Sequence, residues 1–152
     1  MVKLRIAPLK GHEAFPKVFK KSRKFTGKDA VLFVQFGSPD TIEIGEDSFK
    51  TVFVGVTIRK KTARKAVIRN RVKRLLRVAF QNVLKEIFEE YSQAESQFPF
   101  KAFIAVWQSA PEHPKQLRLE HVEPVIRQLI TQAQLRAPEY FSQDRRGSQP
   151  SP

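Results

Sequence analysis

The chain has 152 residues, of which 41% are hydrophobic, and it carries a formal net charge of +13. This length and apolar content predict a single soluble globular domain that buries roughly 70% of its unfolded surface. No apolar run approaches the ~20 residues of a membrane-spanning helix, and the N-terminus lacks the apolar stretch of a secretory signal. The absence of cysteine excludes disulfides, thiolate metal sites and thiol catalysis. We therefore expect a cytoplasmic protein.

The positive charge is concentrated in two segments. Residues 1–28 hold nine cations against one acid, and residues 59–77 hold ten cations and no acid, whereas residues 78–144 hold six cations and nine acids. A basic surface that served only solubility would not be so uneven. A polyanionic partner explains the distribution better, and nucleic acid is the first candidate. An anionic membrane surface is less favoured, because no helix pairs this charge with exposed bulky apolar residues.

The first half of the chain predicts one helix and two clear strands. Residues 9–22 have the spacing of a short amphipathic helix, and Pro16 requires that helix to start near His12 or Glu13. A brief strand near 23–26 is weakly marked. Residues 30–36 and 51–58 have the length and composition of strands. Between them, residues 37–50 contain four acids, a proline and two glycines, which predicts an extended hairpin loop.

The second half predicts a long helix, a strand and a last helix, over residues 62–91, 100–107 and 116–136. The final residues, 137–152, are rich in Pro, Gln, Ser and Gly, so we expect a disordered tail after a single domain over residues 1–136. This order of elements predicts the α+β class, as an α-β sandwich.

The long predicted helix separates its cations from its apolar residues. At about 100° per residue, Ile68, Leu75, Leu76, Ala79 and Val83 share one side. The opposite side carries Lys73, Arg74 and Arg77, with Asn70 near the middle of the charged arc. Arginine offers forked donors to phosphate oxygens and lysine a mobile point charge. Asn70 adds a directed donor and acceptor among pure donors.

A solvated charged face is the simpler interpretation of such an arc. A merely solvated helix normally mixes signs, because like charges at i,i+4 spacing repel. Arg69, Lys73 and Arg77 form such a repelling row. The pattern therefore favours a nucleic-acid-binding surface.

Phe15 and Phe19, four residues apart in the first predicted helix, allow two interpretations. Two phenylalanines at this spacing are more often core residues than platforms for stacked bases, and the same holds for Phe33 in its strand. Five cations between Lys17 and Lys24 favour instead a basic, aromatic-lined groove for a single strand. The residues alone leave both interpretations open.

Signatures of a protein catalyst are missing. His12, His113 and His121 lack metal-ligand spacing, and Gly27-Lys28-Asp29 lacks the flanking residues of a phosphate-binding loop. No set of side chains activates water by itself. We expect no catalytic residue in this chain, and the sequence assigns no metal ligand.

The string Arg69-Asn70-Arg71-Val72-Lys73-Arg74-Leu75-Leu76-Arg77 closely resembles the protein subunit of bacterial ribonuclease P. The likeness covers about residues 9–135. It includes Phe15-Pro16-Lys17-Val18-Phe19, which is similar to the family's first helix, and Val31-Leu32-Phe33, which is similar to its first long strand. Gly55-Val56-Thr57-Ile58 followed by Arg59-Lys60-Lys61 resembles the strand that ends in paired lysines.

The resemblance implies a fold and an activity. The fold would be an α-β sandwich with a mixed sheet of about four strands, three helices and a left-handed βαβ crossover through the basic long helix, against the usual handedness. The chain would bind a catalytic RNA and assist endonucleolytic removal of the 5′ leader of precursor tRNA. The RNA subunit would hold the catalytic groups and most of the Mg²⁺. No membrane or protein partner is predicted.

The resemblance also implies two binding surfaces. The leader would lie as a single strand in a cleft that contains Phe15, Phe19, Phe33 and Thr57. The catalytic RNA would bind the basic helix region, which comprises Lys60, Lys61, Arg64, Lys65, Arg69, Asn70, Arg71, Lys73, Arg74 and Arg77.

Pro16, Arg59 and the length of the acidic 37–50 loop depart from the family pattern, and that loop is positioned to shadow one end of the cleft. Two competing interpretations remain. One is a structural RNA-binding protein such as a ribosomal protein, and the other is an autonomous nuclease.

Overall fold

Six strands build one mixed sheet. The computed structural model describes residues 2–11, 13–111 and 113–148, except for the side chains of Pro114 and of residues 139–148. The strands are β1 (Val2–Pro8), β2 (Arg23–Thr26), β3 (Ala30–Phe36), β4 (Asp40–Ile44), β5 (Asp47–Ile58) and β6 (Phe100–Trp107). Their order is β1-β5-β6-β3-β2, with β4 attached to β5.

Strand β5 pairs with three other strands of this sheet. β1 runs parallel along one of its edges. Its other edge is shared, because β4 pairs antiparallel with residues 47–51 and β6 pairs parallel with residues 53–58. β3 continues antiparallel to β6, and β2 antiparallel to β3. The expected mixed sheet is confirmed, although it has more strands than the four expected.

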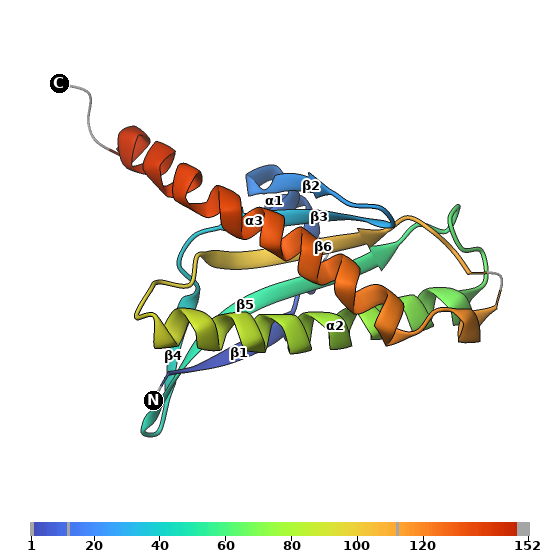
Figure 1. Ribbon diagram of the computed structural model, residues 1–152, viewed down its shortest axis with the longest axis horizontal. Coiled ribbons are helices and arrows are strands. Elements are labelled where there is room, and N and C mark those ends of the chain that lie inside the picture. Colours follow the sequence, from blue (N-terminus) through green and yellow to red (C-terminus); the bar gives the residue numbers. More distant parts are fainter. Residues whose placement is uncertain (1, 12, 112, 149–152) are drawn as a thin grey trace.

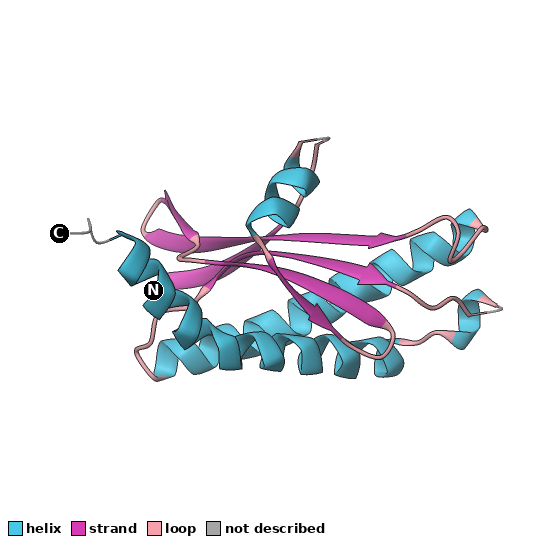
Figure 2. Ribbon diagram, turned by 90° about the horizontal axis from the view of Figure 1, so that it is seen from above, coloured by secondary structure: helices cyan, strands magenta, loops and turns pink. Residues whose placement is uncertain are grey.

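The helices divide unequally between the two faces of the sheet. They are α1 (Ala14–Lys21), α2 (Ala66–Gln93) and α3 (Leu119–Ser148), with a short 3-10 turn η1 (Pro114–Gln116) before α3. Figure 2 shows α2 and α3 on one side of the sheet and α1 on the other. No helix of the described residues is long and apolar enough to cross a membrane.

The main hydrophobic core lies between the sheet and the pair α2 and α3. Val72, Leu76 and Phe80 of α2 pack there against Phe103 of β6 and its neighbours. A second, small cluster lies under α1, where Val18 packs on Ala102 and Ile104. The face on the α1 side is therefore only partly covered, and we call it the open face.

The connection from β5 through α2 to β6 is left-handed, as the resemblance implied. β5 and β6 are adjacent and parallel, and α2 joins them. In Figure 1 both strands point right, α2 lies in front of the sheet, and β6 lies above β5. A right-handed crossover would place β6 below β5 in that view.

Two strands were not expected. The segment Val2–Pro8 forms β1, whose Leu4 and Ile6 pack against the main core. The 37–50 segment, expected to be a hairpin loop, contains β4 and the first part of β5, joined by a turn at Gly45 with φ +62°. Glycine suits this positive φ in a two-residue hairpin turn. All of β4 is exposed, so no buried face marks it in the sequence.

The helix boundaries also differ from those expected from the sequence. α1 begins at Ala14, which places Pro16 in its first turn, as that proline requires. α2 begins four residues later than expected, at Ala66. α3 continues to Ser148, so residues 137–148 are helical where we expected a disordered tail, and residues 149–152 lie outside the described residues. Extending a formed helix adds one hydrogen bond per residue without a new nucleus, which favours this continuation.

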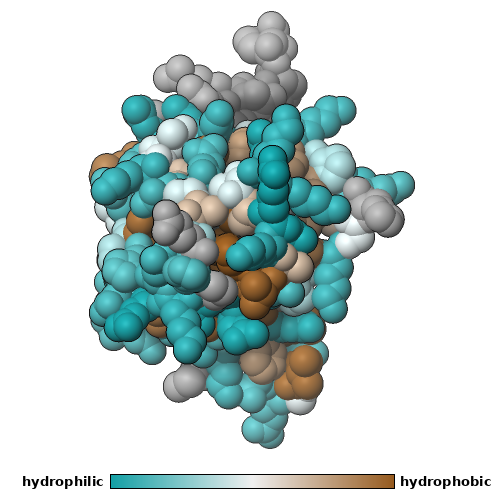
Figure 3. All heavy atoms as spheres, turned by 90° about the vertical axis from the view of Figure 1, so that its right-hand side faces the viewer, coloured by the Kyte–Doolittle hydropathy of each residue, from teal (hydrophilic) through white to brown (hydrophobic). Residues whose placement is uncertain are grey.

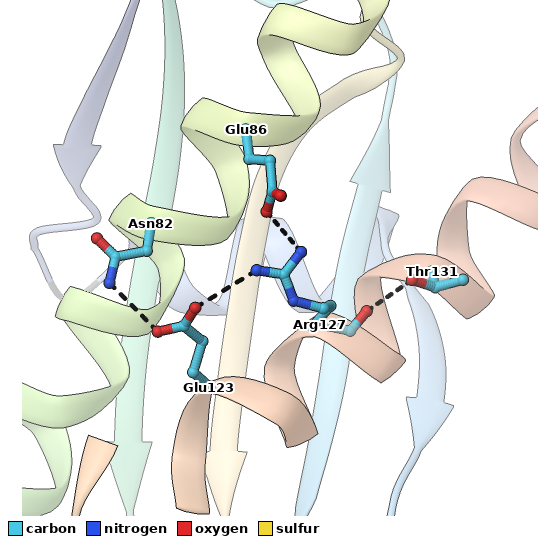
Figure 4. Close-up of polar contacts among 5 residues, drawn as sticks. All are labelled: Asn82, Glu86, Glu123, Arg127 and Thr131. Carbon is cyan, nitrogen blue, oxygen red and sulfur yellow. Dashed lines mark hydrogen bonds and ion pairs between the residues drawn. The ribbon is translucent and has the colours of Figure 1, made fainter. Parts of the chain in front are cut away.

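A polar network ties α2 to α3 beside the core (Figure 4). The Arg127 guanidinium donates to Glu86 at 2.5 Å and to Glu123 at 3.4 Å, and Asn82 donates to Glu123 at 3.3 Å. The hydrogen bond to Glu86 is the main reason why the pKa of Arg127 is raised above its ordinary value, against an opposing effect of burial. Arg127 therefore links α3 to α2 through Glu86.

Gly55 allows α1 to pack closely on the open face. A Cβ added at Gly55 would lie 2.8 Å from Cζ of Phe15 and 3.2 Å from a methyl group of Leu9. Real Cβ atoms essentially never approach another atom to within 3.0 Å, so the contact with Phe15 leaves no room for a side chain at Gly55. The Phe15 ring therefore packs directly on the backbone of β5, and the core interpretation of Phe15 is correct at least in part.

We predict that Gly55→Ala destabilises the fold by about 1–3 kcal/mol, because the new methyl group overpacks the Phe15 ring. Urea unfolding of Gly55→Ala, Phe15→Ala and the double variant measures the coupling. The cost of Gly55→Ala should largely vanish in the Phe15→Ala background. An equal cost in both backgrounds would show that the Phe15 contact is not its cause.

Candidate nucleic-acid interface

The cations of residues 60–77 gather where β5 ends and α2 begins. We define the cationic patch as Lys60, Lys61, Arg64, Lys65, Arg69, Asn70, Arg71, Lys73, Arg74 and Arg77. All are exposed except Arg69, Arg71 and Lys73, which are half-buried. Within the described residues, none of them forms an ion pair with a carboxylate. Figure 3 shows that this end of the molecule is largely hydrophilic.

Arg69 shapes the loop that precedes α2. Its Nη1 donates to the carbonyl oxygens of Ala63 at 2.9 Å and Arg64 at 2.7 Å. Ala63 is itself buried, and its N–H donates to the carbonyl of Arg59 at 3.2 Å. Arg69 therefore fixes the path of loop 59–65 while its Nε and Nη2 donors stay available. Periodicity placed Arg69 on the charged arc and did not reveal this second role.

Arg71 joins α2 to the segment before α3. Its Nε donates to the carbonyl oxygen of Leu117 at 3.1 Å. Beside this bond lies a groove of about 790 Å³ between the first turns of α2 and η1. Its lining residues are Val67, Asn70, Arg71, Arg74, His113 and Lys115. His113 and Lys115 were not expected here, because each is an isolated polar residue in a loop and carries no sequence pattern.

The groove and its surroundings suit a phosphate backbone. α2 has neither a side-chain N-cap nor an acid in its first turn, so the positive end of the helix dipole is not neutralised locally. Backbone N–H groups at a helix start bind anions, and forked arginine donors match phosphate oxygens. Asn70, exposed inside the groove, adds a group that both donates and accepts hydrogen bonds.

Side chains of four strands lie in register across the open face. In one row Lys24, Phe33, Ile104 and Gly55 are in register, and in the next Thr26, Val31, Val106 and Thr57. The predicted cleft residues Phe33 and Thr57 thus lie on the same face in adjacent rows. Both are half-buried.

Helix α1 adds two aromatic rings to this face. The Phe19 and Phe33 rings meet edge to face with centroids 4.7 Å apart, and Phe15 and Phe19 are 6.3 Å apart. Phe19 is 36% exposed, whereas Phe15 is wedged on Gly55. The structure therefore brings all four predicted cleft residues to one face and leaves Phe19 as the more accessible of the two helix phenylalanines.

Phe53 belongs to the same face and was missed. Phe53 lies in β5 next to Ala102 of β6. Its side chain points to the α1 side and is 36% exposed. The sequence contained the signal, because Thr51, Phe53, Gly55 and Thr57 alternate with buried Val52, Val54, Val56 and Ile58. A large exposed aromatic ring within such an alternation marks the face that the core does not use.

The two surfaces adjoin at loop 59–65. Thr57 is the last open-face residue of β5, and Arg59, Lys60 and Lys61 follow it within four positions. No group of three or more His, Asp or Glu side chains within the described residues is arranged to hold a metal ion. The arrangement can bind a polyanion on the cationic patch and an extended strand on the open face.

The sequence and the fold of this chain are both similar to those of known proteins. Residues 5–129 match the family model described as Ribonuclease P. A ribonuclease P protein component from Prochlorococcus marinus (strain MIT 9515) is 33% identical over 75 residues, which are 47% of this chain and 57% of that protein. The match thus spans little more than half of that relative's length.

Solved structures share the fold. The Staphylococcus aureus RNase P protein superposes with a TM-score of 0.52 at 19% identity, over 85% of this chain and 96% of that one. A mutant of the same protein, described as having defective mRNA degradation activity, gives 0.53 at 19% identity, over 84% and 87%. The family model covers most of this chain, and the chain therefore belongs to the ribonuclease P protein family.

Proposed function

We propose that this chain is the protein subunit of ribonuclease P and assists removal of the 5′ leader from precursor tRNA. The observation that supports this proposal most directly is that the fold presents two adjoining surfaces of different chemistry. One is the cationic patch, whose charges are not paired with acids within the described residues, and the other is the open face with its aromatic rings. A structural RNA-binding protein needs only the first. A protein subunit that captures a substrate for a catalytic RNA needs both.

The cationic patch binds the catalytic RNA in this proposal. A folded RNA presents closely spaced phosphates, and release of condensed counterions favours their contact with clustered Lys and Arg. The groove between α2 and η1 receives one stretch of that backbone, with Arg74 and Lys115 on its walls. Arg69 acts partly by holding loop 59–65 in the shape that presents Lys60 and Lys61.

The open face holds the leader as an extended single strand. Bases stack on exposed aromatic rings with little dependence on sequence, and nearby cations follow the backbone. Phe19 and Phe33 supply the rings, and Lys24 stands beside Phe33 in the same row. The leader passes from the mature tRNA end near loop 59–65 along the strands.

Hydrolysis is assigned to the RNA subunit with Mg²⁺. The described residues offer no cluster of metal-ligating side chains, so no ion is assigned to the protein. The role of the chain is to bind and orient, which raises the local concentration of substrate at the RNA site.

A three-arm assay tests this function. Precursor tRNA cleavage in Mg²⁺ at low salt is measured with catalytic RNA alone, with protein alone, and with both. We expect slow cleavage by the RNA, none by the protein, and faster cleavage or a lower KM with both. Cleavage by the protein alone would indicate a nuclease, and no improvement over the RNA would leave a structural RNA-binding protein.

Arg74 offers a clean test of the cationic patch, because its side chain is exposed and makes no hydrogen bond or ion pair within the described residues. We predict that Arg74→Gln weakens binding to the catalytic RNA and lowers the log-log salt slope by about 0.7–0.9 per lost phosphate contact. Lys85→Gln, the same charge change further along α2, is the control and should leave the slope unaltered. Equal slopes in wild type and Arg74→Gln would remove Arg74 from the interface.

Phe19→Leu tests the open face. We predict that it weakens holoenzyme binding to precursor tRNA by about 1–3 kcal/mol, because a stacking platform is lost. Affinity for leaderless tRNA should not change, since the leader alone contacts that ring. Urea unfolding of the variant checks that α1 stays docked. A loss that is equal for both RNAs would assign Phe19 to the fold.

A further inference from the structure

A pocket between β1 and α2 has no role in the function proposed so far. It lies on the side of the sheet that carries α2, opposite the open face, and its volume is about 350 Å³. Pockets that hold small ligands measure about 300–1,000 Å³, so this one is large enough for a single ring system and its substituents. We call it the β1–α2 pocket. Its lining residues are the apolar Ile6, Ala7, Pro8 and Val54 and the polar Lys10, Arg77 and Gln81.

The two strands supply an apolar floor. Pro8 is the parallel partner of Val54 at the end of β1, and Ile6 lies two residues earlier on the same face of the sheet. Val54 is 7% exposed and belongs to the main core, so the core closes the pocket from behind, whereas Pro8 is exposed. A flat apolar group that enters the pocket therefore buries one face against the protein, which favours binding.

Helix α2 supplies polar groups that have no partner in the protein. Arg77 and Gln81 are one turn apart on the flank of α2 that faces β1. The next residue, Asn82, lies on the other flank, where it donates to Glu123 of α3. The side chains of Arg77 and Gln81 are exposed and form no hydrogen bond or ion pair within the described residues. An amide with a free donor and a free acceptor is suited to pair with the edge of a base.

The charges of the pocket are all positive. Lys10 and Arg77 are both exposed, and none of the lining residues is acidic. Arg77 is also the last member of the cationic patch, so the pocket continues that surface along α2. Cations, an apolar floor and a free amide match the phosphate, the plane and the edge of one nucleotide.

We propose that the β1–α2 pocket binds one unpaired nucleotide of the catalytic RNA, with its base on the apolar floor and the base edge on Gln81. The inference rests on the proposed function, because it needs the cationic patch to bind that RNA. A leader on the open face lies on the other side of the sheet. Bases that protrude from loops and bulges of a folded RNA present free edges to a protein. The phosphates bound by the patch tether the nucleotide beside the pocket, so the base contact is intramolecular and adds affinity.

Gln81→Met tests the base contact, because methionine has a similar length and helix propensity but no amide. We expect binding to the catalytic RNA to weaken about tenfold, a factor within the range of paired base-edge hydrogen bonds. The log-log salt slope should not change, because Gln81 carries no charge. Gln93→Met is the matched control, since Gln93 is exposed at the end of α2 and outside the pocket, and it should leave the affinity unaltered. Urea unfolding checks that both variants keep the stability of wild type.

Acylation of 2′-hydroxyl groups in the catalytic RNA identifies the nucleotide. The reaction is run on the free RNA and on its complexes with wild type and with Gln81→Met, each at a saturating protein concentration. We expect one nucleotide that is reactive in the free RNA, protected by wild type and reactive again in the Gln81→Met complex. Protections elsewhere in the RNA should persist, because the cationic patch is intact in this variant.

A free nucleotide is the other source of the same chemistry. The protein without RNA is therefore titrated with each nucleoside 5′-monophosphate in turn. We expect no binding at micromolar concentrations, because the tether to the patch is absent. Micromolar binding that Gln81→Met abolishes would assign the pocket to a small-molecule ligand and overturn the proposal.

The outcomes separate the pocket from the proposed function. If wild type binds the catalytic RNA but Gln81→Met leaves either the affinity or every protection unchanged, the pocket is not a nucleotide site and the proposed function stands. An equal effect of Gln93→Met leads to the same conclusion. If wild type does not bind the catalytic RNA, both proposals fall.

Discussion

The alternation of side chains along β5 is the constraint on which the rest of the molecule depends. Val52, Val54, Val56 and Ile58 fill the main core, so the residues between them must face the other side of the sheet. A slip of one residue would exchange the two sets and expose the core. The burial that stabilises the fold therefore also fixes which side chains remain free on the open face.

The end of β5 also determines where the cationic patch lies. β5 ends at Ile58, and the chain needs only loop 59–65 to enter α2 on the far side of the sheet. The first turns of α2 thus lie at the edge of the open face. Like charges in those turns repel, which weakens the helix locally. Hydrogen bonds from Arg69 and Arg71 to backbone carbonyls, and the buried side of α2, offset that repulsion. In the second half of α2, Glu86 forms an ion pair with Arg127 and so attaches the helix to α3.

Sequence reasoning succeeded where a local period reports a buried surface. It located α2, β3, β6 and residues 51–58 of β5 because one side of each is largely buried. It missed β4, whose residues are all exposed, and β1, whose parallel partner lies far along the chain. Among site residues, the exposed arc could be predicted, but the bonds of Arg69 to the Ala63 carbonyl and of Arg71 to the Leu117 carbonyl could not. Those contacts depend on loop conformations that no spacing encodes.

The two surfaces differ in physical character, and this has a consequence for binding. In the proposed function, the cationic patch binds RNA through counterion release, so we expect its affinity to fall steeply with salt. In the same proposal, the open face binds the leader mainly through stacking on Phe19 and Phe33 and through short-range contacts, which salt screens less. Its far end carries the acids Asp40 and Asp47, the latter paired with Lys3 at 3.5 Å. A strand lying there is held first by charge and then by shape and hydrogen bonding.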